Sequence, residues 1–166
     1  MTIEVRIESG AWDAATFEAQ SVAACTQTLR YLGIDPDLCE VSILGCDDLR
    51  IAALNTDFRG KRQATNVLSW PTYDLAAETD GARPHPPAPD FSAAIELGDI
   101  AIAFETCERE AAAAQKTLSD HVTHLIVHGT LHLLGYDHIR DLDATLMQRI
   151  EIEILGNMGL DDPYRE

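Results

Sequence analysis

Most of the chain's six histidines fall within the short stretch 121–138. His128 and His132 are four residues apart in a segment expected to be helical, which places both rings on one face, one turn apart. Two imidazoles at this spacing can bind one metal ion. The spacing favours a metal site, and the alternative is that these histidines fill ordinary structural positions.

A third ligand has to come from outside this helix face. His124 also lies four residues before His128, but about 12 Å of helix rise separates His124 from His132, too far for one compact ion. Gly135 can adopt the left-handed conformation that ends a helix, and His138 follows three residues later. The resulting spacing, H-x-x-x-H-x-x-G-x-x-H, is that of metzincin zinc sites. We predict that the metal ligands are His128, His132 and His138.

The residues between these ligands restrict the chemistry. Gly129 stands where metalloproteases carry the glutamate that serves as general base, which argues against peptide hydrolysis. Three histidines without an obvious fourth protein ligand leave a coordination position for water or substrate, as in catalytic zinc sites. Such an ion can activate water or polarise a phosphoryl or carbonyl oxygen. Asp137 can orient a ligand histidine or be an ordinary turn residue, and we expect His121 and His124 not to be ligands.

The surrounding pattern predicts the elements that position this site. Alternation predicts strands, and apolar residues at helical spacing predict helices. We therefore expect an α+β fold: a single domain, residues 1–166, with a mixed sheet of about four strands, helices packed against it, and the metal site on a helix and the following turn. The expected strands are 3–8, 39–44, 65–70 and 97–104, and the expected helices are 13–31, a short one from 47 or 48, 105–115, 119–134 (capped by Ser119) and 140–155.

Two connecting segments differ from these elements. Residues 71–95 hold five of the seven prolines, so we expect a flexible loop there, with a functional lid as the alternative. Residues 58–62 read as a turn that carries three basic side chains.

Composition restricts the partners and the compartment. The chain has 166 residues and is 46% hydrophobic, enough for one domain with a real core. The N-terminus is not a signal peptide and no apolar run reaches the ~18 residues of a membrane span, so we expect a cytoplasmic protein that does not contact membranes. Its four cysteines are expected to be buried, reduced thiols. The net charge of −16 excludes a broad basic surface for nucleic acid, so any site for a polyanion must be local.

Taken together, these segments resemble the YbeY family of bacterial endoribonucleases and rRNA maturation factors. The resemblance rests on the string from His128 to His138 and on three further segments that occur in the same order. It covers the chain from about residue 40, with Trp70 where the family tends to have Phe and with a long proline-rich stretch. The three supporting segments are Leu54-Asn55 with Phe58-Arg59-Gly60-Lys61, Thr65-Asn66-Val67-Leu68-Ser69, and Leu97-Gly98-Asp99-Ile100.

The resemblance implies a single-metal, usually zinc, endoribonuclease that acts on single-stranded rRNA in 16S rRNA 3′-end processing and in ribosome quality control. The three histidines would hold one Zn²⁺, with water or substrate as a further ligand, and Arg59 would be the arginine important for activity. Ribosomal proteins or assembly factors are the expected partners, and DNA is not. Two alternatives are a non-catalytic ribosome-assembly factor with a structural metal and a metal-dependent hydrolase of another substrate class.

An acidic chain that acts on RNA needs a focused positive site. Arg59, Lys61 and Arg62 are three of the 12 basic residues, and a bound ion would add charge beside them. Arg59 is suited to hold a phosphate through two hydrogen bonds. Because the rest of the surface is acidic, we expect weak affinity for naked RNA. The nucleophile is left open between a metal-bound hydroxide and a ribose 2′-OH.

Four further side chains are left with two interpretations each. Asn66 and Ser69 can contact RNA or stabilise a strand end. Trp70 and Tyr136 can stack on bases, although packing within the protein is favoured.

Overall fold

Four strands form one mixed sheet, in the order β1-β2-β4-β3. The computed structural model describes residues 2–60, 63–88 and 94–165, except for the side chains of Phe58 and Arg59. The first three strands in this order run parallel, and the edge strand β3 pairs antiparallel with β4. The predicted α+β fold with a mixed four-stranded sheet is confirmed. The strands are β1 (Thr2–Ile7), β2 (Cys39–Cys46), β3 (Val67–Pro71) and β4 (Ile95–Ala103).

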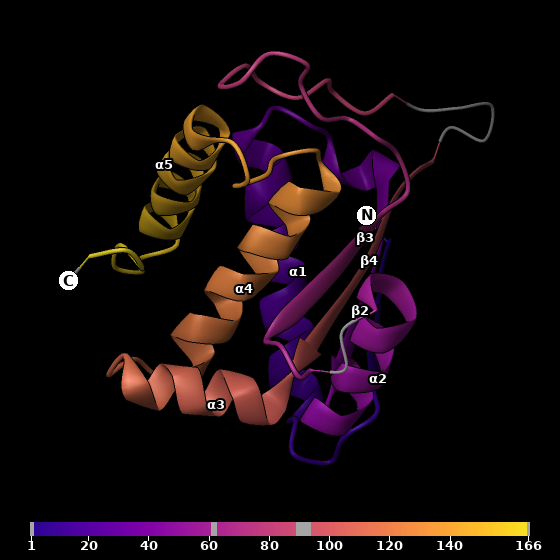
Figure 1. Ribbon diagram of the computed structural model, residues 1–166, viewed down its shortest axis with the longest axis vertical. Coiled ribbons are helices and arrows are strands. Elements are labelled where there is room, and N and C mark those ends of the chain that lie inside the picture. The colour runs from indigo at the N-terminus through magenta and orange to yellow at the C-terminus, as the bar shows by residue number, and fades with distance from the viewer. Residues whose placement is uncertain (1, 61–62, 89–93, 166) are drawn as a thin grey trace.

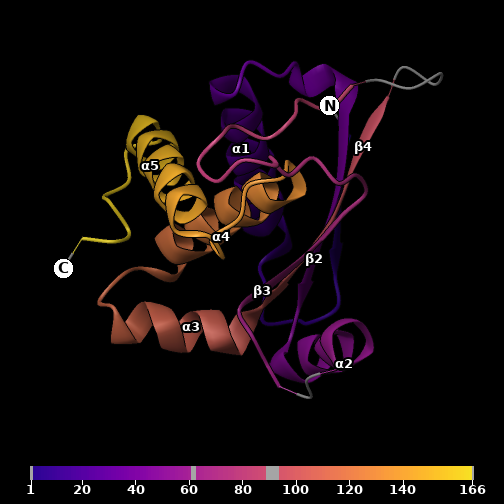
Figure 2. The ribbon, with the colours of Figure 1, turned by 45° about the horizontal axis from the view of Figure 1, so that its top comes forward.

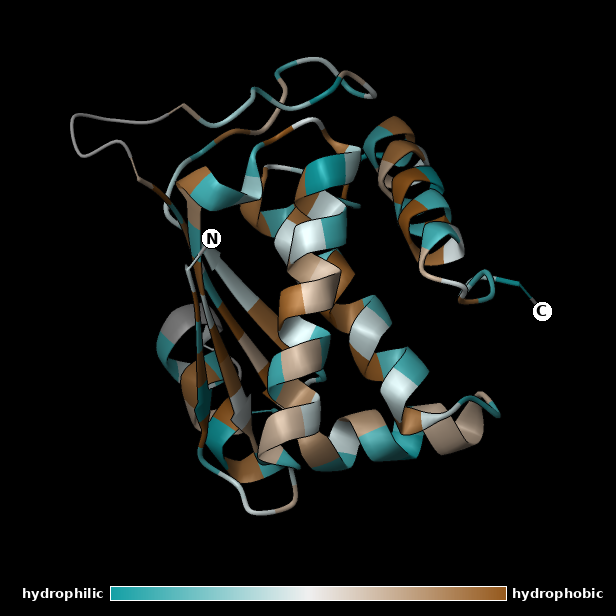
Figure 3. Ribbon diagram, turned by 180° about the vertical axis from the view of Figure 1, so that it is seen from behind, coloured by the Kyte–Doolittle hydropathy of each residue, from teal (hydrophilic) through white to brown (hydrophobic). Residues whose placement is uncertain are grey.

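Helices cover the sheet unequally. Helices α1 and α4 lie against one face, α5 lies outside α4, and α2 lies near the opposite face (Figures 1 and 2). Figure 3 shows apolar and polar bands alternating along α5, as expected for a helix with one buried side. The helices are α1 (Ala14–Tyr31), α2 (Asp48–Arg59), α3 (Phe104–Ala113), α4 (Leu118–Leu133) and α5 (Asp141–Asn157), with a short 3-10 turn η1 (Pro36–Leu38).

The alternation of side chains along the strands produces two apolar clusters, one on each face. Ile100 and Ile102 join the large core beneath α1 and α4, whereas Ala101 and Ala103 join a smaller cluster beside α2. A shift in the β2–β4 register just before Gly98 allows Leu97 to face the large core as well. All four cysteines are buried and free, as predicted.

Several sequence expectations need correction at element boundaries. Helix α2 extends through residues 58 and 59, which were expected in a turn, and ends at Gly60 with φ +67°. Helix α4 is capped by Thr117, whose side chain accepts a hydrogen bond from the Asp120 amide, and not by Ser119. The 3-10 turn η1 was not predicted, since one turn carries no periodic signal.

The proline-rich connection contains no helix or strand in its described part, 72–88 and 94, and it passes over the ends of α4 and α5 (Figure 1). Asp80 accepts hydrogen bonds from the Leu142 and Asp143 amides, and so caps α5 from outside that helix. Arg140 donates to the carbonyl oxygens of residues 77 and 78, and the Gly81 amide donates to Asp143. These bonds fix the place of the segment, while its predicted mobility stays a prediction.

Helices α2 and α3 cap each other. The Asp48 carboxylate accepts hydrogen bonds from the Thr106 amide at 3.0 Å and from Arg109 at 2.9 Å, while the Asp48 amide donates to Glu105 at 2.8 Å. Replacing Asp48 with alanine should therefore lower the free energy of unfolding by about 1–2 kcal/mol in urea titrations. Asp57→Ala, at an exposed position on the same helix, is the matched control and should show no comparable loss.

The same carboxylate gives this stabilisation a pH dependence. Partial burial opposes its charge, but hydrogen bonds from Thr106 and Arg109 hold the pKa of Asp48 below its usual value. A lowered folded-state pKa contributes stability above the unfolded value of about 3.9 and loses it as the pH falls through the folded one. The difference in stability between parent and Asp48→Ala should therefore be constant near neutral pH and shrink in acid. A constant difference down to strongly acidic pH would contradict this account.

Candidate metal centre

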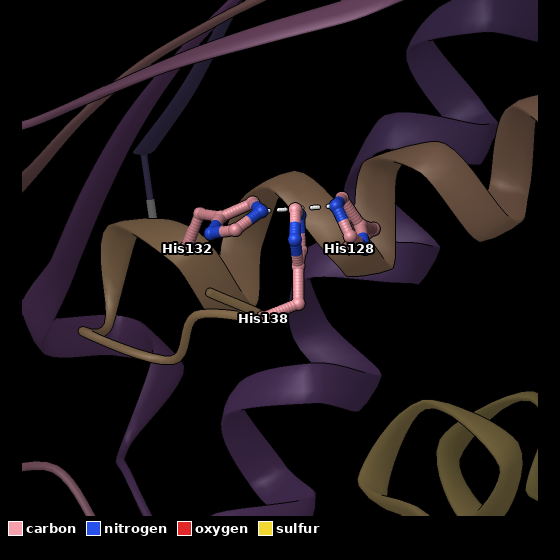
Figure 4. A group of neighbouring side chains, drawn as sticks. All are labelled: His128, His132 and His138. Atoms are coloured by element: carbon pink, nitrogen blue, oxygen red, sulfur yellow. Dashed lines mark hydrogen bonds between the residues drawn. The ribbon is translucent and has the colours of Figure 1, made fainter. Parts of the chain in front are cut away.

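The structure brings the three predicted ligands together at the end of α4 (Figure 4). His128 and His132 project from one face of the helix, and the ring of His138 points between them from the following turn. One ligand nitrogen from each ring lies within 4.8 Å of the other two. The turn depends on Gly135, which has φ +97°, as the spacing predicted.

The hydrogen bonds of two rings decide which nitrogens are free. His128 Nδ1 lies 2.5 Å from Glu151 Oε1, and His132 Nδ1 lies 2.9 Å from the Tyr136 carbonyl oxygen. Burial opposes the charge of Glu151, yet hydrogen bonds from His124 and His128 lower its pKa to about 2, so it is ionised at neutral pH. A carboxylate and a carbonyl only accept hydrogen bonds, so both rings carry their proton on Nδ1.

This arrangement fits a cation. The Nε2 atoms of His128 and His132 are 2.9 Å apart, and in neutral rings both present lone pairs that repel at this distance. Burial, reinforced by His128 and His138, lowers the pKa of His132 to about 4, which opposes a second proton there. Zinc–nitrogen bonds of ~2.0–2.1 Å at tetrahedral angles separate two ligand nitrogens by about 3.3 Å. The donor set thus suits a metal ion such as Zn²⁺.

Glu151 is the residue of this site that sequence reasoning missed. It is fully buried on α5, and its carboxylate is shared among three donors: His124, His128 and Tyr164. The sequence held one signal, because Glu151 occupies a position in the buried stripe of α5, between Met147 and Leu155. A carboxylate in such a stripe is almost never buried without a partner.

The other polar candidates have different partners. His121 Nε2 lies 2.9 Å from Glu110 Oε1 and His124 Nε2 lies 3.2 Å from Glu151 Oε2. His124 also belongs to a second group that could hold an ion, with His128 and Glu151. Asp137 accepts a hydrogen bond from the amide of the next residue, so the interpretation as a turn residue describes it better than orientation of a ligand ring.

A cleft of about 940 Å³ opens beside the three histidines. The edge strand β3 and the residues before it supply one wall, residues 72–76 another, and the turn after α4 the third. Asn66 and Ser69 both line it, although Asn66 also bonds Glu110 and Ser69 bonds the Gly129 carbonyl oxygen. Tyr136 borders the cleft but is packed in the core, as favoured.

Gly129 faces the sheet and not the histidines. A Cβ atom there would lie 3.1 Å from Ser69 Oγ and 3.2 Å from Ile100 side-chain atoms, so the helix packs on β3 and β4 through this glycine. A glutamate at the metalloprotease position would not fit in this packing.

Replacing Gly129 with alanine should lower the free energy of unfolding by about 0.5–2 kcal/mol, because overpacking outweighs the roughly 0.5–1 kcal/mol that alanine gains over glycine inside a helix. The matched control is Gly156→Ala in α5, which has open space around its missing Cβ and should raise stability by about 0.5–1 kcal/mol. Thermal unfolding of both variants checks the pair, and equal stabilisation of the two would contradict close packing at Gly129.

The three basic side chains that were predicted to assist the site lie outside the described part of the structure. Arg59 ends α2, but its side chain lies outside the described part of the structure, as do Lys61 and Arg62 altogether. Among the described residues lining the cleft, the charged side chains besides histidine are acidic, Asp74 and Asp137. Arg83 lies close by, since its side chain hydrogen-bonds Tyr136, which borders the cleft. A metal ion bound by the histidines would add positive charge there.

Comparison with known proteins decides the family. A family model described as endoribonuclease YbeY matches residues 2–159. The chain belongs to the endoribonuclease YbeY family. A relative from Ruegeria pomeroyi, which carries that name, is 61% identical over 164 residues, 99% of this chain and 98% of its own. Another of the same name, from Jannaschia sp., is 55% identical over 99% of this chain and 100% of its own.

A solved structure agrees at the level of the fold. The solution structure of a Thermotoga maritima protein, 18% identical, matches with a TM-score of 0.57 over 99% of this chain and 100% of its own. This YbeY family member thus shares its overall fold with the Thermotoga maritima protein, although the two sequences differ at most positions. In the described part of the chain, each helix is too short or too polar to span a bilayer.

Proposed function

We propose that this protein is a metal-dependent endoribonuclease that cleaves single-stranded RNA during rRNA maturation, at the 3′ end of 16S rRNA, and in ribosome quality control. Family membership supports the endoribonuclease activity, since the relatives from Ruegeria pomeroyi and Jannaschia sp. bear that name. The whole chain, residues 1–166, would act as one hydrolase domain in the cytoplasm.

The observation that carries this proposal is the convergence of His128, His132 and His138 beside an open cleft. His128 and His132 have their second nitrogens engaged by oxygen acceptors, so their Nε2 lone pairs are directed at one point. Orientation of this kind by a carboxylate or a carbonyl is typical of histidines that ligate zinc.

Each part of the site would have a separate task. The three histidines would hold one Zn²⁺, which supplies Lewis-acid charge to a phosphodiester. Arg59 would bind a phosphate oxygen and stabilise the charge that develops during cleavage. Asn66 and Ser69, at the cleft wall, would offer hydrogen bonds to the sugar or phosphate groups of an unpaired strand.

The acidic surface shapes the choice of partner. With a net charge of −16, the protein would repel naked RNA outside this site. Basic ribosomal proteins, or assembly factors that carry them, would be attracted by the same surface and would bring the RNA within reach.

Chelation of nuclease-free protein tests the proposal. A fluorescent single-stranded RNA should be cut by the protein with Zn²⁺, remain intact after EDTA treatment, and be cut again after Zn²⁺ is restored. A duplex of the same sequence should resist. Circular dichroism before and after EDTA separates a catalytic ion, whose removal leaves the fold intact, from a structural one.

Two results would overturn the proposal. One is cleavage that persists without metal, and the other is protein that binds Zn²⁺ and supports 16S maturation yet cuts no RNA under any condition. The second result would instead support a non-catalytic assembly factor.

A further inference from the structure

The carboxylate behind His128 is held from two directions. Its Oε1 atom accepts the hydrogen bond from His128, while its Oε2 atom accepts from His124 and from the hydroxyl of Tyr164. His124 comes from α4, one turn before His128, but Tyr164 comes from the segment that follows α5. A residue 26 positions beyond His138 thus enters the hydrogen-bond network of a candidate ligand.

Other contacts fix the segment that carries Tyr164. The Lys116 ammonium group donates to the Pro163 carbonyl oxygen at 3.0 Å, and the Leu160 amide donates to the Leu155 carbonyl oxygen at 2.9 Å. The Tyr164 ring lies edge-on to His124, with 5.6 Å between ring centroids. The phenol is therefore presented to Glu151 by a backbone held at Pro163 and by the edge contact of its ring with His124, although part of the ring is exposed.

This geometry gives the hydroxyl a specific task. The terminal torsion of a glutamate is broad, so a carboxylate held at one oxygen alone can rotate. Donors on Oε2 stop that rotation and keep Oε1 directed at His128 Nδ1. His124 supplies one of these donors through Nε2, which lies 3.2 Å from Oε2. Tyr164 supplies the second.

We propose that Glu151 and Tyr164 are positioning residues for the metal ligand His128, with Tyr164 acting through the carboxylate. The inference rests on the proposed metal site and adds the C-terminal segment to it. Outer partners of zinc-bound histidines commonly change metal affinity 10- to 100-fold when they are replaced.

The first test is the Zn²⁺ affinity of Tyr164→Phe, measured by competition with a chromophoric chelator. This variant loses one hydroxyl and keeps the ring, so it should fold with little change in melting temperature but bind Zn²⁺ about 10-fold more weakly. Glu151→Gln should lose 10- to 100-fold. Tyr31→Phe, which removes a phenol hydroxyl at the end of α1, is the matched control and should bind as the parent does.

A second test needs no metal. In the metal-free parent, nitrogen-15 NMR should show His128 as the Nδ1–H tautomer, with its proton deshielded and slow to exchange. In Tyr164→Phe that proton should move upfield and exchange faster, whereas in Tyr31→Phe it should be unchanged. A purely structural role for Tyr164 would alter the melting temperature and leave this resonance in place.

The two experiments separate failure of the inference from failure of the proposed function. If the parent binds no metal, the proposed metal site is wrong, while the NMR result still reports on the network. If the parent binds Zn²⁺ and Tyr164→Phe binds it equally well with an unchanged His128 resonance, the inference alone is overturned.

Discussion

Replacement of His132 with alanine should weaken Zn²⁺ binding by about 100-fold or more. Apparent binding energies of zinc at four-ligand protein sites are about 10–16 kcal/mol, so one ligand contributes roughly 3 kcal/mol. His132 also comes pre-oriented, because the Tyr136 carbonyl oxygen holds its Nδ1–H. The same variant should lose RNA cleavage at any Zn²⁺ concentration below its new dissociation constant.

The control for this variant is His85→Ala, which removes an exposed histidine from the segment between β3 and β4. It should bind Zn²⁺ and cut RNA as the parent does. Direct titration against a chelator gives the affinity, and high Zn²⁺ should restore part of the activity of His132→Ala. Parental affinity in His132→Ala would remove this residue from the ligand set.

Substitution of Gly135 with alanine should strongly destabilise the fold and disturb the metal site at the same time. Its φ of +97° is strained for any other residue, and a Cβ atom would lie 2.7 Å from the Leu75 carbonyl carbon. Backbone cannot move aside as a flexible side chain can. We expect the free energy of unfolding to fall by about 3 kcal/mol, combining backbone strain with the clash.

Gly33→Ala separates these two costs. Gly33 follows α1 with φ +74°, and its missing Cβ has open space around it, so alanine there meets only the conformational penalty of about 1 kcal/mol. Urea titration of both variants gives the difference that belongs to the contact with residues 75 and 76. Gly135→Ala should also weaken Zn²⁺ binding, because it displaces the turn leading to His138. Equal costs at the two glycines would mean that the contact contributes nothing.

Local patterns carried much of the prediction. The helix from 118 to 133 and the glycine turn after it follow from spacing within a single stretch, and these place the three histidines together. The strands were visible for the same reason, since alternation such as Ile3, Val5 and Ile7 marks the inner side of β1. Boundaries shifted where a cap one or two positions away made the better hydrogen bond, as at Thr117.

The remaining features depend on contacts between distant segments. Nothing near Asp80 indicates that it caps a helix beginning at residue 141, and nothing near Glu151 indicates which histidines it meets. Such pairs are set by strand order and helix packing, which cannot be read from local patterns in a single sequence. Residues 72–76 belong to the segment that was expected to be a flexible loop, and their place in a wall of the cleft depends on the same long-range packing.

The position of Tyr164 has a consequence for synthesis on the ribosome. All three histidines are translated before α5 is complete, and the phenol follows His138 by 26 residues, about 1–5 s of elongation at 5–20 residues per second. For the first half of that interval Glu151 has not yet been added, and for the second half its carboxylate lacks the hydroxyl of Tyr164. The full network can therefore form only after residue 164 has been added, so the proposed metal site would gain its last positioning contact well after its three ligands.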